Sequence, residues 1–379
     1  MGPSLLQPCY LEPVNGGRNL RAWLAILVLL ASGADAWAAA RGQSRRARRP
    51  TASRRAPRRP APLVPPSVVV PPGASARDLA VAEAARRALS GVSGAVVAMD
   101  PHNGRVMAIV NPRAAVERAF QPCSVFKIVV AIAGLTEGIV TPSTLITCDG
   151  GCWFWPGHGP IDLRRALANS CNPYFQRVGE RLGYEKVQRY AQLLGLGSPS
   201  GINIEGGEAA GRIPYYVGQA GMGKLSSHAE GITTSPAQLA VLLSTVVNGG
   251  VVFQPQVSAA DGFVPSERWR LPRGTVLQGL ADGFLSAVNE GSAAEAFDPD
   301  IVVAGKTGTC AGLGWFASYA PADKPEMVMV VFLTAATGHQ ASSVAGRIYH
   351  DLYKGTAGAL AARREGPPPA GRSTGGSLP

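Results

Sequence analysis

The chain has 379 residues, of which 46% are hydrophobic and only 16% charged, so a protein that is disordered throughout is excluded. Its formal charge of +11 is unevenly distributed: residues 41–59 contain nine arginines and no acidic residue, which leaves +2 for the rest of the chain. A nucleic-acid-binding domain spreads its basic surface over the fold. The distribution therefore argues against a nucleic-acid partner.

The N-terminal 40 residues show the pattern of an export signal. Arg18 and Arg21 precede an uncharged apolar stretch, residues 22–34, and small residues follow it up to Ala40. This length is typical of a secretory signal peptide and short for a membrane span, which needs roughly 20 apolar residues. Extended to Ala40, the stretch could instead serve as an uncleaved anchor. We therefore expect residues 1–40 to be a signal peptide or signal anchor, and the folded body to be exported, either periplasmic or at the extracytoplasmic face of the inner membrane.

Residues 41–75 are rich in Arg and Pro and have neither helical nor alternating periodicity, so we expect an extended linker. Its basic part, Arg41–Arg59, could contact a membrane or an anionic polymer, or the segment could be a simple spacer. Residues 359–379 form a second tail rich in Pro, Gly and Ser. One globular domain is expected between them, over residues 76–358.

Two groups of strands enclose a mostly helical region. Apolar runs that predict strands lie at 94–99, 105–110, 301–306, 314–319 and 327–333, and the first two flank the hairpin sequence Asp-Pro-His-Asn-Gly. Helical patterns lie at 125–136, 163–168, 184–194, 236–247, 276–288 and 343–353. This order predicts an α+β fold, with an antiparallel sheet formed by N- and C-terminal strands, flanking helices and a mostly helical second lobe.

The first candidate for chemistry is a serine and a lysine three residues apart. Ser124 and Lys127 follow Pro122 at the start of a predicted helix, where residues i and i+3 share one face. A lysine whose pKa is lowered can take the proton of a serine hydroxyl, and a helix N-terminus favours a developing oxyanion. Alone the pattern is weak, because a helix N-cap and an exposed helix lysine would look the same.

Two further motifs, each occurring once in the chain, strengthen this interpretation. Ser170–Asn172 (Ser-Cys-Asn) follows a helical stretch, and Lys306–Gly308 (Lys-Thr-Gly) ends a predicted strand. The chain contains only six lysines, yet lysine stands at both positions where the chemistry needs a cation that can share or lose a proton. Coincidence is therefore a poor explanation of the three motifs.

The three motifs resemble the set found in penicillin-binding proteins and serine β-lactamases. The surrounding segments, such as GAVVAMDPHNGRVMAIV and TTSPAQLAVLLSTVVNGG, are also similar to that family. From about Gly94 to about Tyr353 the chain resembles a penicillin-binding protein transpeptidase domain.

The resemblance implies catalytic roles for the matching residues. Ser124 would be the acylated nucleophile, and Lys127 the base that takes its proton. Ser170 would pass a proton to the leaving group, and Asn172 would hold either the substrate's peptide carbonyl or Lys127. Lys306 would raise the positive potential and so depress the pKa of Lys127.

The strand that carries Lys306 would also bind substrate. Thr307 would shape the strand, and Gly308 would let a peptide backbone approach closely. Thr309 would offer its hydroxyl to the substrate carboxylate. Its N–H and that of Ser124 would form the oxyanion hole.

The activity implied is that of a peptidoglycan D,D-transpeptidase, which forms a serine acyl-enzyme with D-Ala-D-Ala stem peptides and then joins it to an amine. Water in place of the amine would give a carboxypeptidase, and β-lactam antibiotics would bind covalently at the same serine. A class D-like β-lactamase and a non-catalytic β-lactam sensor are the alternatives. Class D enzymes usually have an apolar residue where this chain has Asn172. No cofactor or metal ion is expected.

The cysteines allow further predictions. Cys148 and Cys152 flank a short Asp-Gly-Gly loop and could form a local disulfide or remain two free thiols; zinc is the weaker interpretation, because no second Cys/His pair has matching spacing. Cys123 and Cys310 neighbour the two residues of the expected oxyanion hole. We therefore expect their Cα atoms within roughly 10 Å of each other, with a disulfide the less expected outcome.

The remaining conspicuous residues receive plainer interpretations. Residues 153–155 (Trp-Phe-Trp) could border a substrate cleft, although packing is the commoner use of such a cluster. His158, His228 and His339 lack ligand or triad spacing, so we expect structural or surface positions. Residues 221–224 (Gly-Met-Gly-Lys) do not match a phosphate-binding loop and predict a turn before the next helix.

Overall fold

The computed structural model describes residues 65–154, 156–257 and 262–355. All of them belong to one compact unit of the chain. The predicted signal segment, the Arg-rich part of the linker and the predicted tail lie outside the described residues, so those predictions remain predictions. Within the described part, no helix combines the length and the apolar character needed to span a membrane.

A six-stranded sheet in the order β1-β3-β2-β10-β9-β8 forms the centre of the unit, and every neighbouring pair in it is antiparallel. Its strands are β1 (Val68–Val69), β2 (Gly94–Met99), β3 (Val106–Val110), β8 (Ala304–Cys310), β9 (Leu313–Ala320) and β10 (Met327–Thr334). The N- and C-terminal strands meet where Val97 of β2 lies opposite Val330 of β10. The predicted α+β fold, with a sheet closed by both ends of the domain, is confirmed.

The sheet begins earlier than the boundary predicted at residue 76. Val68 and Val69 pair with Val110 and Ile109 at the free edge of β3. Both are β-branched residues in the apolar run 68–70, which suits a strand better than a solvated linker. The end of the predicted linker is therefore part of the folded unit.

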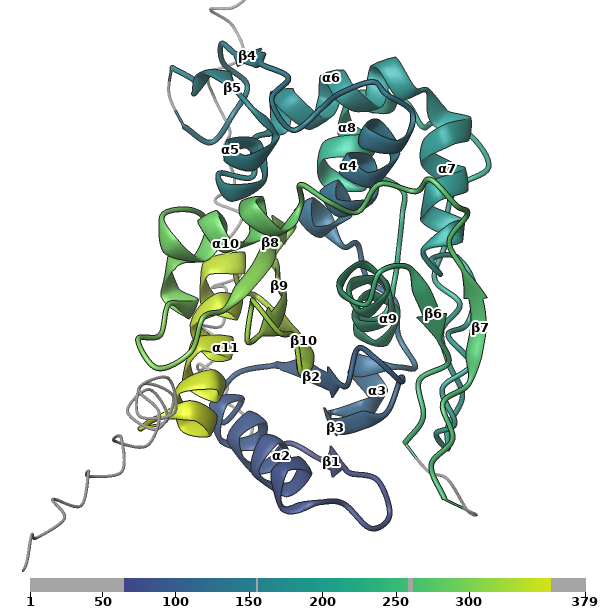
Figure 1. The fold of residues 1–379 in the computed structure, drawn as a ribbon, viewed down its shortest axis with the longest axis vertical. Helices are drawn as coiled ribbons and strands as arrows, with labels where there is room; N and C mark the ends of the chain where they lie inside the picture. Colours follow the sequence, from purple (N-terminus) through teal and green to yellow (C-terminus); the bar gives the residue numbers. More distant parts are fainter. Residues whose placement is uncertain (1–64, 155, 258–261, 356–379) are drawn as a thin grey trace, which may run out of the picture. The chain divides into compact units, whose positions relative to one another are not determined.

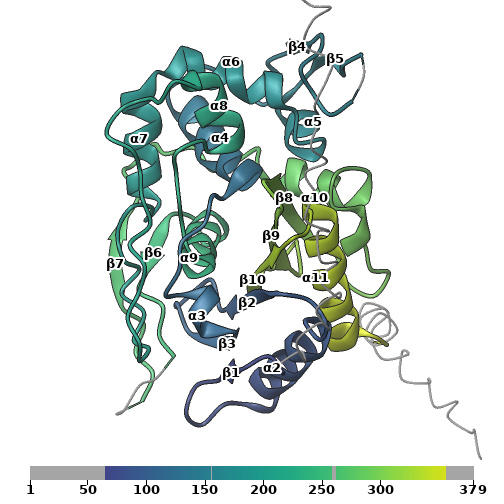
Figure 2. The same cartoon turned by 180° about the vertical axis from the view of Figure 1, so that it is seen from behind.

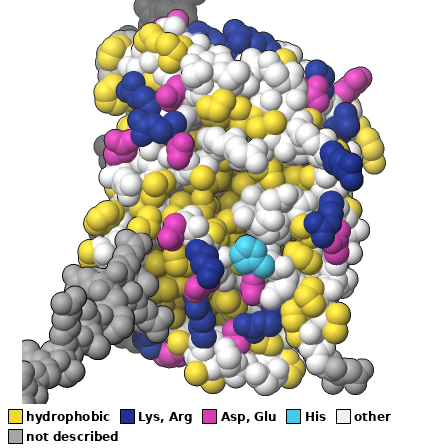
Figure 3. All heavy atoms as spheres, viewed as in Figure 1, with side chains coloured by type: hydrophobic (Ala, Val, Ile, Leu, Met, Phe, Trp, Pro, Cys, Tyr) yellow, Lys and Arg dark blue, Asp and Glu magenta, His cyan; other side chains and the backbone are white. Residues whose placement is uncertain are grey.

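Side chains point alternately to the two faces along each strand, so both faces of this apolar sheet need a cover, and helices pack on each of them. Val96 and Ala98 of β2 belong to one core cluster, and Val97 and Met99 to the other. The helices α2 (Ala76–Ala88) and α11 (Gly338–Tyr353) pack on the first face, and α9 (Pro236–Val247) packs on the second (Figures 1 and 2). Figure 3 shows basic and acidic side chains interspersed over one side of the molecule.

A helical lobe lies beside the sheet, at the top of Figure 1. It contains α4 (Lys127–Thr136), α5 (Leu163–Ala168), α6 (Asn172–Leu182), α7 (Tyr184–Leu193), α8 (Gly221–His228) and the small hairpin of β4 (Ile146–Cys148) and β5 (Gly159–Ile161). The remaining elements are α10 (Ala281–Asn289), which packs on α5 and β8, α3 (Pro112–Ala115), which lies beside β2 and β3, and the two-stranded sheet of β6 (Val251–Phe253) and β7 (Glu267–Arg270), which packs on α9. Nearly every residue of α4 is buried, so the lobe is built around this helix.

The prediction of a turn at 221–224 is wrong, because these residues begin α8. Two glycines within four residues argue against a helix by intrinsic propensity. Close packing against α6 outweighs that preference: a Cβ at Gly179 of α6 would collide with the side chain of Ser226 of α8. Only glycine at this position lets the two helices approach so closely.

Candidate active site

Ser124 lies in a short 3-10 helix, Cys123–Phe126, that leads directly into α4. Its side chain is largely buried, and its Oγ donates to the carbonyl oxygen of Ser227 at 3.4 Å. Cys123, just before it, has a φ of 53°, a left-handed conformation that glycine adopts without strain. Glycine would therefore suit this position at least as well as the cysteine that occupies it.

Lys127 is fully buried one helical turn beyond Ser124. Its Nζ lies 2.7 Å from the carbonyl oxygen of Ser170, 2.7 Å from Oδ1 of Asn172 and 3.2 Å from Oγ of Ser170. The first two partners can only accept hydrogen bonds. A neutral amine would donate its two N–H groups to them, which leaves its lone pair free to receive a proton.

The electrostatics of the two buried lysines favour their neutral forms. Burial lowers the pKa of Lys127 to about 7, although Cys171 and Cys152 act in the opposite direction. The pKa of Lys306 is lowered well below its usual value, first by burial and then by the charge of Lys127. The expected lowering of the Lys127 pKa is present, but burial is its main cause, rather than the charge of Lys306.

The Lys-Thr-Gly motif lies within β8, the edge strand of the sheet, rather than at the end of a strand. The Nζ of Lys306 donates to the carbonyl of Thr307 at 2.9 Å, and Oγ1 of Thr307 lies 2.7 Å from Oγ of Ser292. A Cβ on Gly308 would lie 2.8 Å from the carbonyl oxygen of Pro122. The close approach at this glycine is therefore to the turn that carries Ser124.

A disulfide joins Cys123 to Cys310, with their Cα atoms 5.6 Å apart. The prediction that these two residues lie close together is confirmed, whereas the expectation that they are not bonded is wrong. The bond ties the residue before Ser124 to the residue after Thr309. It therefore holds together the two backbone segments whose N–H groups are the candidate oxyanion donors.

A cavity of about 350 Å³ lies where these segments meet. It is lined by Ser124, Trp153, Ser170, Asn172, His228, Ser292, Thr307, Thr309, Thr337 and His339. Lys127 and Lys306 are buried behind this surface. Five of the eight residues selected from the sequence thus face one cavity. Lys127 is hydrogen-bonded to two of these five, Ser170 and Asn172.

The cavity wall also contains residues whose roles the sequence did not reveal. Trp153 lines it, so the aromatic cluster at residues 153–155 does border the cavity, which was the less common of its two expected uses. The Nε1 of Trp153 donates to the carbonyl of Asn169 at 2.6 Å. His228 and His339 line it too, which their spacing in the sequence did not indicate; His339 is exposed, as expected of a surface histidine. Burial, with smaller effects from Lys127 and Lys224, lowers the pKa of His228 to about 4, so its imidazole is neutral at pH 7.

Comparison with known proteins assigns the chain to a family. The sequence profile described as the penicillin binding protein transpeptidase domain matches residues 94–354. The chain belongs to this family. Among curated members, peptidoglycan D,D-transpeptidase MrdA of Haemophilus influenzae is 29% identical over 344 residues, covering 69% of this chain and 52% of that protein. Stage V sporulation protein D of Bacillus subtilis is 28% identical over 287 residues, covering 62% and 44%.

Solved penicillin-binding proteins share the fold. Pseudomonas aeruginosa PBP2, in complex with WCK 5153, has a TM-score of 0.63 and 23% identity, covering 72% of this chain and 75% of that chain. Penicillin-binding protein A of M. tuberculosis, an imipenem acyl-enzyme complex, has a TM-score of 0.61 and 21% identity, covering 73% and 78%. The chain spans about half the length of the curated relatives it matches.

Proposed function

We propose that this chain is a serine peptidoglycan D,D-transpeptidase that acts outside the cytoplasm. The observation that carries the proposal is the contact of the buried Lys127 with both Ser170 and Asn172, one helical turn from Ser124. This arrangement supplies a nucleophile, a base whose pKa is near neutrality and a hydroxyl to relay a proton. Relatives named peptidoglycan D,D-transpeptidase support the choice of substrate.

In the acylation step, Oγ of Ser124 attacks the carbonyl carbon between the two D-alanines of a stem peptide. Lys127 takes the hydroxyl proton, and the N–H groups of Ser124 and Thr309 stabilise the negative oxygen that develops. The C–N bond then breaks. The departing D-alanine nitrogen receives its proton through the hydroxyl of Ser170, which borders both Lys127 and the cavity.

In the second step an amine of another stem peptide attacks the acyl-enzyme, which forms a cross-link and frees Ser124. Attack by water instead would give carboxypeptidase activity. A β-lactam would acylate Ser124 as a mimic of the D-Ala-D-Ala bond, and the imipenem acyl-enzyme of the M. tuberculosis relative supports this extension.

β-Lactamase activity is the second candidate, and the cavity argues against it. Among the described residues that line the cavity, none is an aspartate or glutamate that could activate water for deacylation. Asn172 also occupies the position where class D enzymes usually have an apolar residue, and its amide is bonded to Lys127. The acyl-enzyme is therefore expected to persist.

Intact-mass measurement after exposure to penicillin tests the proposal. Wild type should retain one penicillin adduct, Ser124→Ala should retain none, and the exposed-serine control Ser143→Ala should behave as wild type. Purified stem peptides and lipid-linked strands should then yield cross-linked product. An adduct that survives on Ser124→Ala would overturn the nucleophile, rapid release of hydrolysed penicillin would establish a β-lactamase, and acylation without peptide activity would establish a sensor.

A further inference from the structure

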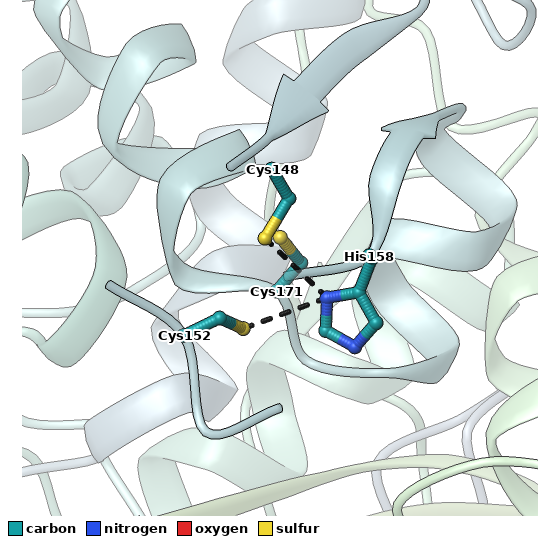
Figure 4. A group of neighbouring side chains, drawn as sticks. All are labelled: Cys148, Cys152, His158 and Cys171. Atoms are coloured by element: carbon teal, nitrogen blue, oxygen red, sulfur yellow. Dashed lines mark hydrogen bonds between the residues drawn. The ribbon is translucent and has the colours of Figure 1, made fainter. Parts of the chain in front are cut away.

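Three cysteines and a histidine converge beside the active site (Figure 4). They are Cys148 at the end of β4, Cys152 in the loop that follows, His158 just before β5 and Cys171 at the N-terminus of α6. Their sulfur and ring-nitrogen atoms all lie within 4.8 Å of one another. Folding therefore brings His158 next to the sulfurs, although its spacing in the sequence did not indicate a ligand.

The distances in this cluster match a tetrahedral site. The Nδ1 atom of His158 lies 3.5 Å from Sγ of Cys148 and 3.6 Å from Sγ of Cys152. In a tetrahedral zinc site with Zn–S of about 2.3 Å and Zn–N of about 2.0 Å, neighbouring sulfur and nitrogen ligands are about 3.6 Å apart. The observed separations therefore leave room for one metal ion at the centre.

The local backbone is built to bring these side chains together. Gly157 has a φ of 131°, and a Cβ there would collide with the carbonyl oxygen of Cys148 and lie 2.9 Å from the nitrogen of Gly150. Only glycine therefore lets the loop fold back onto the end of β4. The ring of His158 is oriented by Phe154, which stacks on it at 5.3 Å, and by Trp153, which meets it edge-on at 5.6 Å.

The number of thiols argues for a metal rather than a disulfide. Cys148, Cys152 and Cys171 are all free, and Cys148 and Cys171 are buried. A disulfide could use only two of these sulfurs and would leave a third beside the imidazole. One metal ion would use all four donors, and a set of three thiolates and one imidazole in tetrahedral geometry selects zinc.

We propose that Cys148, Cys152, His158 and Cys171 bind one zinc ion, which positions the Ser170–Asn172 turn. Binding replaces the three thiol protons, which are released to solvent, by three Zn–S bonds, and His158 contributes its Nδ1 lone pair. The complex carries one net negative charge. The N-terminus of the eleven-residue helix α6, where Cys171 is the N-cap residue, favours that charge.

The link to the active site is direct in sequence and in space. Cys171 is the middle residue of the Ser-Cys-Asn motif, and its two neighbours, Ser170 and Asn172, both contact Nζ of Lys127. Ser170 has a φ of 50°, a left-handed conformation that a non-glycine residue holds only when its surroundings enforce it. Cys152 precedes Trp153, a residue of the cavity wall. The ion would thus fix two sides of the site; this positioning role, unlike the metal site itself, rests on the proposed function.

Metal content tests the site independently of activity. The full chain, purified without chelator, should contain about one zinc ion per chain by mass spectrometry of the metal. Cobalt substitution should give the intense visible bands of a tetrahedral thiolate site. Cys152→Ser, which alters a half-buried ligand, should lose most of the zinc, whereas Cys152→Asp, which keeps an anionic oxygen ligand, should retain it, as should the exposed-histidine control His102→Gln.

Two results in which the chain holds no metal would overturn the metal site. One is a chain without metal in which two of the three cysteines have become resistant to alkylation, as a disulfide requires. The other is a chain without metal in which all three are alkylated. Zinc that persists in Cys152→Ser, Cys171→Ser and His158→Ala alike would also assign the ion to other residues.

The rate of acylation by penicillin tests the positioning role. Removing zinc, or substituting Cys152 by Ser, should slow acylation about tenfold or more at temperatures well below the melting point, and zinc or Cys152→Asp should restore it. Stoichiometric zinc with an unchanged rate would overturn the positioning role and leave the site intact. A zinc-loaded wild type that penicillin never acylates would instead count against the proposed function.

Discussion

The Nζ atom of Lys127 lies 2.7 Å from Oδ1 of Asn172, although the two residues are 45 positions apart in the chain. The contact joins the first residue of α4 to the first residue of α6. Asn172 lines the cavity and Lys127 is buried one turn beyond Ser124, so two helix N-termini lie near the place where negative charge develops in acyl transfer. Burial of the lysine between them keeps its amine available as a base.

Replacing Lys127 by methionine should separate activity from stability. The acylation rate should fall about 10²- to 10⁴-fold, because the base is lost. The melting temperature should change by about 4 °C or less, because the stability gained by no longer burying an amine offsets the cost of leaving its two acceptors without a hydrogen bond. Stopped-flow measurement with a fluorescent penicillin and a thermal melt check both. Lys186→Met, at a partly exposed lysine paired with Glu137, should acylate as wild type. A fast Lys127→Met would exclude Lys127 as the base.

The acylation rate should increase with pH through neutrality. Lys127 has its pKa lowered to about 7, and only its neutral form accepts a proton. Below that pKa the rate should fall roughly tenfold per pH unit, and above about pH 8 it should be level. Measuring acylation from pH 5.5 to 9, with a thermal melt at each pH, checks this. A rate that is flat or decreases with pH would contradict the assignment of the base.

Gly308→Ala should impair both folding and acylation. The added methyl group would lie 2.8 Å from the carbonyl oxygen of Pro122 and 3.1 Å from Cγ2 of Val125, so β8 and the Ser124 turn must separate. We expect a loss of about 1–3 kcal/mol in the free energy of unfolding. Gly218→Ala is the matched control, because a Cβ there has no neighbour within 4 Å. Equal stability of the two variants, by chemical denaturation, would show that a methyl group fits between β8 and the Ser124 turn.

Breaking the disulfide should destabilise the unit and slow acylation. Cys310→Ala should lower the free energy of unfolding by about 2–5 kcal/mol under non-reducing conditions, and reductant should bring wild type to the same value. Cys123→Gly removes the same bond but suits the φ of 53° at that position, so it should be at least as stable as Cys123→Ala. Denaturation of the three variants provides the comparison. A wild type insensitive to reductant would contradict the bond's contribution.

Much of the sheet could be predicted because its strands are continuous apolar runs. Residues 94–99 form β2 with the predicted bounds, and 327–333 form all but the last residue of β10. The helix α6 was missed because Pro173 and Gly179 interrupt its pattern, and only the structure shows that Pro173 lies in the first turn and Gly179 at a helix contact. Local propensity cannot contain such tertiary information.

The site was predictable where a short motif fixes the chemistry and unpredictable where distant segments meet. Ser124 and Lys127 are one helical turn apart, so their proximity follows from the helix alone. Whether Asn172 holds substrate or Lys127 depended on the approach of α6 to α4. His158 lies ten residues from Cys148 and thirteen from Cys171, and no regular spacing reveals that these side chains converge.

The bond between Cys123 and Cys310 makes a covalent ring of the intervening chain, since the two cysteines are 187 positions apart. The whole helical lobe, from α4 to α8 with β4 and β5, lies inside that ring. A protease that cuts once within it cannot release either piece. A single nick between these cysteines would therefore leave one molecule of unchanged mass, apart from the water added, until a reductant separated the fragments.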